Sequence, residues 1–272
     1  MSAEEPEIAD SSHVMTKAVV RYVGTGFAGW QVQPRQRTVQ GALEEALRTI
    51  SGQPVRVTGA GRTDSGVHAL GQVCSFVWRA NADLDQLRRS LSCMLAPEIR
   101  VLSIEPAPRE FHARKSAAGK RYSYSLYLGP EADPFTAAYA WRVSPKLNLD
   151  RLASLCPLIE GEHDFAGFQS SGASEKLSTV RTLHSVRLAP GGVFSPLDAR
   201  DLWRVEFHGN GFLYKMIRNI VGTFTEIARG ALSESRIEER LSSPGPYRGL
   251  TAPAHGLTLI EVLYDPPAPA AS

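Results

Sequence analysis

Few residues in this 272-residue sequence are suited to disulfide, metal or membrane chemistry. Its three cysteines, Cys74, Cys93 and Cys156, lack CxxC spacing, so we expect buried free thiols rather than a disulfide framework or a zinc site. The seven histidines include no HxH or HExxH pair, which argues against a metal centre. No apolar run approaches the roughly 20 residues of a membrane span, and the start, MSAEEPEIAD, lacks the basic and apolar parts of a signal peptide. We therefore expect a cytoplasmic protein.

Negative charge is concentrated at the start of the chain. The net charge is only +2, yet four of the 28 acidic residues fall within the first ten positions. The rest of the chain carries 30 basic residues against 24 acidic ones, a net charge of +6. Within it, the segment REFHARKSAAGKR (109–121) has five basic residues and one glutamate. Such a cluster is usually a solvated surface, but it is also what an RNA or phosphate site requires.

Periodicity predicts an α+β fold, and residues 16–107 supply its first lobe. A strand-like run, KAVVRYV, precedes the amphipathic helix TVQGALEEALRTI. Two strands, PVRVTGA and the alternating GQVCSFVW, then precede a helix, LDQLRRSLSCML, and a last strand, IRVLSIEP. The order βαββαβ is typical of a ferredoxin-like or RRM-like unit.

The same order returns in residues 108–264. Its segments are KRYSYSLYLG, LDRLASLCPLIEG, strands near 182–188 and 202–208, the apolar-striped helix GFLYKMIRNIVGTFTEIARG and the strand GLTLIEVLY. Two tandem units predict mainly antiparallel sheets flanking a central cleft. The acidic residues 1–15 and the proline- and alanine-rich residues 265–272 are expected to be disordered tails.

The motif GTGFAG (24–29) matches GxGxxG and follows a predicted strand. A dinucleotide-binding turn opens directly into a helix, whereas Trp30, Gln31 and Pro34 intervene here. A kinase-type loop is not supported either, because no V-A-I-K or H-R-D motif follows. We interpret the motif as a glycine-rich loop beside a site.

A single aspartate, Asp64, stands between the glycines of GAGRTDSGVHALGQV (59–73). An aspartate before Ser-Gly is most often a turn former. Asp64, Ser65 and His68 also suggest a catalytic triad, but the serine lacks a G-x-S-x-G elbow. A glycoside hydrolase needs two facing carboxylates, and this loop has one.

Two further pairs have both a structural and a functional interpretation. Tyr122 and Tyr124 share a strand face, as core aromatics do, but their strand follows the basic segment, where a tyrosine could stack on a base. Lys215 and Arg218 are three residues apart on the long predicted helix, opposite its apolar stripe. They are either solvent-exposed or fixed counter-charges.

Six blocks of the sequence resemble the tRNA pseudouridine synthases of the TruA type, in the order found in that family. They span the chain from about Lys17 to Tyr264, and they are GTGFAGWQVQP, GAGRTDSGVHALGQV, FHARKSAAGKRYSY, GEHDFAGF, GFLYKMIRNIVG and APAHGL. The resemblance implies an isomerase that converts uridines at positions 38, 39 or 40 of the tRNA anticodon stem-loop to pseudouridine. It also implies a homodimer that uses neither a metal nor an organic cofactor.

The resemblance implies roles for three residues in the reaction. Asp64 matches the family's catalytic aspartate, Tyr122 the tyrosine that stacks against the target base, and Arg218 the basic partner of the aspartate. The reaction breaks the N-glycosidic bond of uridine, rotates the base and joins its C5 to C1′. The carboxylate can attack C1′ or C6, or assist a glycal-like intermediate, and the sequence leaves these routes open.

The remaining substrate contacts are expected to be basic. Arg62 matches the arginine associated with displacing the target base, Arg114 lies in the RNA-facing basic block, and Lys215 adds a cation near Arg218. Two alternatives stay open at this point: a non-catalytic RNA-binding protein built on paired RRM-like units, although no RNP1 pattern is present, and a nucleotide enzyme with a glycine loop. The acidic start and SSGASEK (170–176) have no clear counterpart in the family pattern.

Overall fold

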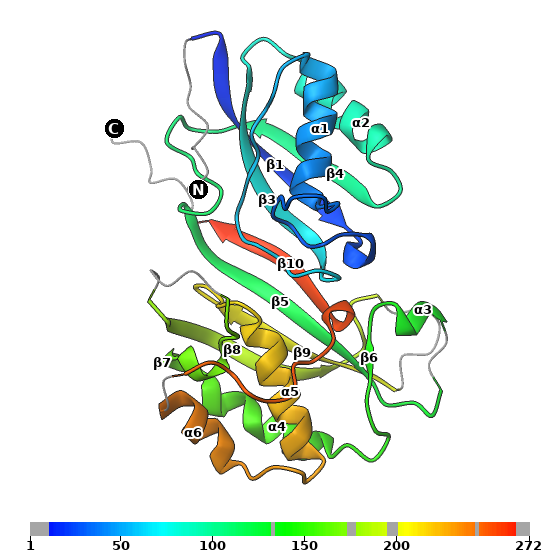
Figure 1. Cartoon of the computed structure of the whole chain (residues 1–272), viewed down its shortest axis with the longest axis vertical. Helices are drawn as coiled ribbons and strands as arrows, with labels where there is room; N and C mark the ends of the chain where they lie inside the picture. The colour runs from blue at the N-terminus through cyan, green and yellow to red at the C-terminus, as the bar shows by residue number, and fades with distance from the viewer. Residues whose placement is uncertain (1–10, 132–133, 173–177, 195–200, 243–244, 265–272) are drawn as a thin grey trace. The chain divides into compact units, whose positions relative to one another are not determined.

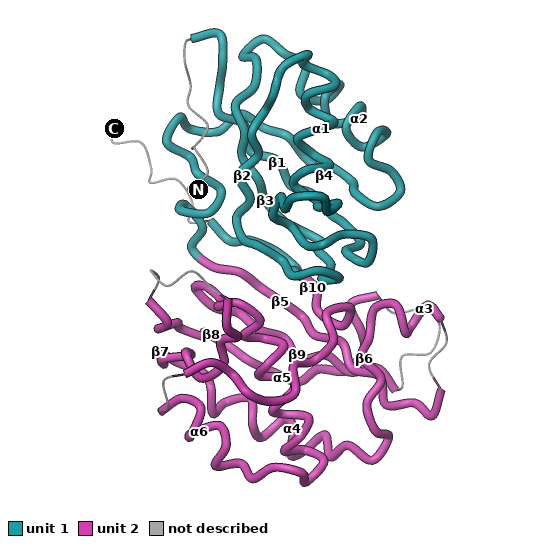
Figure 2. Tube along the Cα trace, viewed as in Figure 1, with its two compact units in different colours: residues 1–118, 259–272 teal, residues 119–258 magenta. Residues whose placement is uncertain are grey.

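The chain divides into two compact units (Figure 2), unit 1 with residues 1–118 and 259–272 and unit 2 with residues 119–258. The structure is a computed structural model. It describes residues 11–131, 134–172, 178–194, 201–242 and 245–264. Most of the predicted acidic tail, the predicted C-terminal tail and most of SSGASEK lie outside the described residues.

Unit 1 has the predicted βαββαβ order. Its elements are β1 (His13–Tyr22), the 3-10 turn η1 (Gly24–Gly26), α1 (Val39–Ser51), β2 (Thr58–Gly59), β3 (His68–Arg79), α2 (Leu84–Met94) and β4 (Ile99–Pro106). Strand β1 pairs antiparallel with both β3 and β4, and β2 pairs antiparallel with β3. Both helices lie over the same face of these strands (Figure 1).

Two strand boundaries differ from the predicted ones. Strand β1 begins four residues before KAVVRYV because His13–Thr16 pair with β3. The predicted strand PVRVTGA shrinks to Thr58–Gly59. Helix side chains take the backbone groups that a strand would use, because Val57 N donates to Glu44 Oε1 (3.0 Å) and Val57 O accepts from Gln40 Nε2 (2.9 Å).

Strand β3 is buried on both faces, not on alternate residues as GQVCSFVW suggested. The run from Gln72 to Phe76 is buried throughout. Residues of the basic segment cover the second face, since Ala113 packs against Val73 and its amide donates to Ser75 Oγ (3.3 Å). The hydroxyl of Tyr264, at the end of β10 (Leu257–Tyr264), donates to Ala113 O (2.7 Å). The last strand therefore contributes to unit 1 from Leu259 onward.

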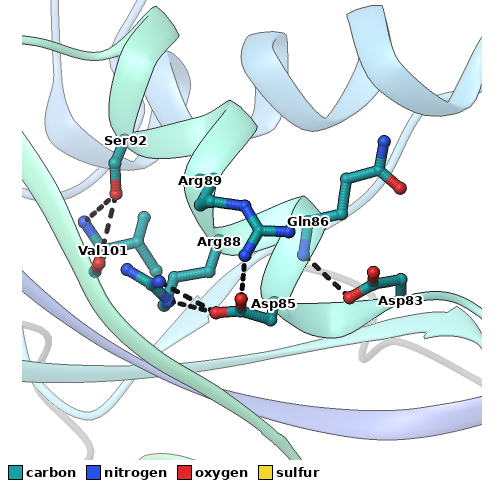
Figure 3. A network of polar contacts seen from close by, with 7 residues as sticks. All are labelled: Asp83, Asp85, Gln86, Arg88, Arg89, Ser92 and Val101. Atoms are coloured by element: carbon teal, nitrogen blue, oxygen red, sulfur yellow. Dashed lines mark hydrogen bonds and ion pairs between the residues drawn. The ribbon is translucent and has the colours of Figure 1, made fainter.

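Polar contacts stabilise helix α2 and join it to β4 (Figure 3). Asp83 caps the helix by accepting a hydrogen bond from Gln86 N (2.9 Å), as an N-cap aspartate does. Asp85 forms ion pairs with the arginines three and four residues further along the helix. Ser92 Oγ donates to Val101 O and accepts from Val101 N, each at 3.2 Å. The helix is thus tied to the edge of the sheet by a side chain.

In its described residues, unit 2 keeps the predicted order and adds the helices α3 and α6, the strands β6 and β7 and the 3-10 turns η3 and η4. Its elements are β5 (Ala117–Tyr127), α3 (Pro134–Ala137), β6 (Trp141–Arg142), α4 (Leu149–Leu155), η2 (Cys156–Ile159), β7 (Gly161–Asp164), η3 (Ala166–Phe168), β8 (Val180–Pro190), β9 (Leu202–Gly209), α5 (Met216–Ala228), α6 (Ser235–Ser242), η4 (Ala254–Gly256) and the start of β10. Antiparallel pairing gives the order β5-β9-β8-β7, and β6 pairs parallel with β5.

Helix α5 is shorter and more completely buried than its apolar stripe indicated. It begins at Met216, because Lys215 adopts a left-handed φ of 58° at the N-cap. Within the helix only Arg218 and Glu226 are not buried. Other segments of unit 2 pack on the face of α5 that was expected to meet solvent. These segments form hydrogen bonds with polar side chains of α5, which are described below.

Both units combine helices with mostly antiparallel strands, so the predicted α+β class is confirmed. No helix in the described ranges is long and apolar enough to cross a membrane.

Candidate active site

Asp64 lies in the loop that joins β2 to β3, and the backbone on both sides of it is held. Thr63 O accepts a hydrogen bond from Trp30 N (3.0 Å), and Asp64 O accepts one from Val67 N (3.1 Å) in a tight turn. The buried hydroxyls of Thr63 and Tyr22 are 2.9 Å apart and hydrogen-bonded. Asp64 begins a tight turn, as its place before Ser-Gly predicted, and the residue is half-buried.

Tyr22 holds this loop as a neutral phenol. Burial raises its pKa to about 12, so the hydroxyl keeps its proton across the physiological range. Gln72 of β3 adds a second contact by donating from Nε2 to Gly61 O (2.9 Å). The loop is therefore tied to β1 and β3 by side chains that carry no charge.

The GTGFAG loop packs against the loop of Asp64. Gly24 N donates to His68 Nδ1 (3.1 Å), and Ser65 Oγ donates to Phe27 O (3.1 Å). Gly29 has a φ of 96°, and a Cβ there would lie 2.5 Å from Thr63 O and 3.1 Å from the carbonyl carbon of Asp64. Only glycine fits this position, so the motif supports the loop of Asp64.

Arg62 is oriented by two glutamines, Gln31 and Gln40, to which the sequence had assigned no role. Its Nε donates to Gln31 Oε1 (3.2 Å), and Gln31 Nε2 donates to Gln40 Oε1 (2.8 Å). Gln40 is only 7% exposed and also binds the backbone of Val57. This relay fixes one edge of an otherwise exposed guanidinium. The signal available in the sequence was Gln40 itself, a glutamine at a buried position in the first turn of α1.

Arg114 also belongs to unit 1 and is exposed on a turn of the basic segment. His112 Nδ1 accepts hydrogen bonds from Arg114 N (3.1 Å) and Lys115 N (3.2 Å). Ala113, which lies between His112 and Arg114, is fully buried against β3. The segment therefore presents its basic side chains from an anchored backbone.

Tyr122 lies in unit 2 on β5 and is only 7% exposed. Its ring meets the ring of Phe212 edge-on, with 5.1 Å between the centroids. Phe212 belongs to the loop that leads to α5, as does Lys215, whose Nζ lies 5.0 Å from the ring centroid of Tyr214. Lys215 was expected three residues from Arg218 on one helix face, but it precedes the helix because of its left-handed backbone.

Arg218 lies in the first turn of α5 and is bracketed by one residue of a distant segment. Its Nε donates to Ala252 O (2.8 Å), while Ala252 N donates to Arg218 O (3.0 Å). The guanidinium lies near Tyr124, whose pKa burial raises well above its ordinary value. It also lies near His255, whose pKa is lowered by burial and further by Arg218. Arg218 is thus a cation held by backbone beside neutral groups.

Unit 1 brings Asp64 and Arg62 together in one loop and also carries Arg114. Unit 2 carries Tyr122, Lys215 and Arg218. Within the described ranges, no three His, Cys, Asp or Glu side chains are grouped so that they could hold a metal ion.

A family model and the sequences of individual relatives indicate the same family for this chain. A family model described as tRNA pseudouridine synthase matches residues 18–114 and 155–265. The chain is 39% identical over 250 residues to tRNA pseudouridine synthase A of Geobacter sp. (strain M21), a match that covers 91% of this chain and 98% of the relative. It is 40% identical over 255 residues to tRNA pseudouridine synthase A of Lacticaseibacillus casei (strain BL23), with the same coverage of the two chains.

Replacing Gly29 with alanine tests the contact between the two loops. Gly29→Ala should lower the free energy of unfolding by about 2–4 kcal/mol, because it adds a clash with Thr63 O to the cost of a left-handed backbone. Gly52→Ala is the matched control: Gly52 also has a positive φ (75°), but a Cβ there would meet nothing within 4 Å, so the loss should be about 1 kcal/mol. Urea unfolding measures both, and equal losses would show that the loops do not press together at Gly29.

The lowered pKa of His255 predicts a pH-dependent stability. In the unfolded chain a histidine titrates near 6.5, whereas in the fold His255 stays neutral to lower pH. As the pH falls through about 6.5, the unfolded state takes up a proton that the folded state does not, so the free energy of unfolding decreases until the folded pKa is reached. His255→Gln should weaken this decrease in urea titrations between pH 7.5 and 5. Identical pH profiles for the two proteins would contradict it.

Proposed function

Because this chain belongs to the tRNA pseudouridine synthase family and isomerises uridine to pseudouridine in tRNA, we propose that Asp64 is its catalytic carboxylate. The observation that carries this proposal is the fixed turn at Asp64, held through Thr63 by the amide of Trp30 and the hydroxyl of Tyr22. A reacting group must be held in place if its approach to a substrate atom is to be reproducible.

The isomerisation needs one nucleophilic or basic oxygen and no net redox change. The N1–C1′ bond of uridine breaks, the base turns, and a C5–C1′ bond forms as C5 loses its proton to a base and N1 takes one up from water. Asp64 can supply a nucleophilic oxygen to C1′ or to C6, or stabilise and deprotonate a glycal-like intermediate. Each route returns the carboxylate unchanged at the end of the cycle.

We assign Arg218 as the counter-charge of this carboxylate. An opposite charge nearby favours the ionised form of an acid, and a guanidinium offers a planar pair of donors that matches a carboxylate. The Nε of Arg218 is already used by Ala252 O, and this bond fixes the direction of the rest of the group. Tyr122 is assigned the stacking contact with the target base, which offsets part of the cost of taking that base out of its helix.

The other basic residues are assigned to RNA. Arg62, oriented by Gln31, would enter the space that the displaced base leaves, and Arg114 and Lys215 would contact phosphates. The net charge of +6 outside the acidic start favours an RNA backbone without reading its sequence. The proposed targets are uridines at positions 38, 39 or 40 of the anticodon stem-loop, and a tRNA substrate fits the expected cytoplasmic location.

The finer architecture is part of the proposal. The two units would be tandem ferredoxin-like lobes, and the substrate would bind in the cleft that the family resemblance implies. The βαββαβ order of unit 1 supports this plan. The family match sets aside the alternatives of a non-catalytic RRM-like protein and of a nucleotide enzyme.

Release of tritium from tRNA labelled at uridine C5 tests the role of Asp64. The wild-type protein should release label to water, because C5 loses its hydrogen in the reaction. Asp64→Asn should reduce the rate by at least about 1,000-fold, since an amide is a poor nucleophile and base. Asp83→Asn is the control: asparagine caps a helix as well as aspartate does, so its activity should equal that of the wild type. Wild-type release by Asp64→Asn would overturn the assignment.

The homodimer implied by the resemblance can be measured directly. Sedimentation equilibrium of the full chain at micromolar concentration should give twice the mass of one chain. A single-chain mass throughout the concentration range would contradict it.

A further inference from the structure

A buried amide lies beside Arg218 in sequence and takes no part in the proposed reaction. Asn219, on α5, is 0% exposed. Its Nδ2 donates to Phe168 O (2.8 Å) and to Ser170 Oγ (3.1 Å), and its Oδ1 accepts from Thr251 Oγ1 (2.7 Å). A buried amide with bonds on both of its ends is held in a single orientation. Asn219 therefore joins α5 to two segments that are distant in sequence.

Thr251 connects this amide to the backbone that brackets Arg218. The neighbouring residue, Ala252, donates from N to Arg218 O (3.0 Å) and accepts at O from Arg218 Nε (2.8 Å). Three hydrogen bonds thus join Arg218 and Asn219 of α5 to Thr251 and Ala252, which belong to a segment formed by residues 247–253. The direction of the guanidinium depends on where Ala252 O lies.

The segment is held against α5 along its length. A Cβ on Gly222, one turn after Arg218, would lie 1.7 Å from Leu250 O, so the two backbones are in direct contact. At one end, Tyr247 OH is hydrogen-bonded to Thr223 Oγ1 of α5 (3.0 Å) and also donates to Leu250 O (3.0 Å). At the other end, Pro253 O accepts from Tyr124 OH of β5 (2.8 Å). The bond from Thr251 is the side-chain link closest to Ala252.

We propose that Asn219 and Thr251 are positioning residues that set the direction of the Arg218 side chain. The inference rests on the proposed role of Arg218 as the counter-charge of Asp64. Without the Thr251 hydroxyl, Asn219 Oδ1 loses its partner in a buried site, and the segment loses the side-chain bond that fixes its position on α5 next to Ala252. A misplacement of about 1 Å in a catalytic site can cost on the order of 100-fold in rate. Neither residue needs to contact RNA for this effect.

The experiment compares two threonine-to-valine variants in the full chain. Thr251→Val should lower the single-turnover rate of tritium release by about 10-fold to 100-fold while the Kd for tRNA stays within about twofold. Thr251→Ser, which keeps the hydroxyl, should restore most of the rate. The control is Thr225→Val: this buried hydroxyl lies on α5 and donates to Val221 O (2.8 Å) of its own helix instead of to residues 247–253. It should lose stability without losing rate.

Arg218→Gln separates failure of the inference from failure of the proposed function. If Thr251 acts through Arg218, adding Thr251→Val to Arg218→Gln should lower the rate no further. Equal rates for Thr251→Val and Thr225→Val, with Arg218→Gln slow, would overturn the positioning role alone. A wild-type rate for Arg218→Gln would overturn the role of Arg218 and the inference together.

Discussion

The hydrogen bond from Trp30 N to Thr63 O is the contact on which the candidate site depends, because it fixes the backbone directly before Asp64. The glycine loop that directly precedes this amide approaches so closely that only glycine fits at position 29. The sequence of this loop offers a single carboxylate, and hydrogen bonds to the backbone before and after Asp64 define its place. The neutral partners Tyr22 and Gln72 hold the loop without adding a charge that would compete for Asp64.

In unit 2 the backbone holds a cation, the guanidinium of Arg218. Arg218 is held by the backbone of Ala252, and two of the residues close to it, Tyr124 and His255, are a phenol and an imidazole that burial keeps neutral. A fixed guanidinium loses little entropy when it binds a carboxylate, which suits it to a reaction that needs one ionised acid throughout. The buried helix α5 makes this possible, because segments of unit 2 pack on the face that a surface helix would leave to solvent.

Local signals in the sequence were sufficient for the α+β class and the order of the main elements, whereas the role of Asp64 came from the family resemblance and stays a prediction. Periodicity located α1 to within a residue, since its apolar stripe and its cap at Thr38 agree. The long-range contacts had no such signal. The strand around Val57 shortened because Gln40 and Glu44 bind its backbone from α1. Asn219 and Thr251 are neutral residues 32 positions apart in sequence, and no local pattern predicts that they meet.

The most direct test of the central claim is a double-mutant cycle in stability for Asp64 and Arg218. Urea unfolding of the wild type, Asp64→Asn, Arg218→Gln and the double variant measures whether the two charges interact in the folded protein. If they form the proposed pair, the sum of the stability losses in the two single variants should exceed the loss in the double variant by about 1 kcal/mol or more. Losses that add to within about 0.5 kcal/mol would show that Arg218 is not the counter-charge of Asp64.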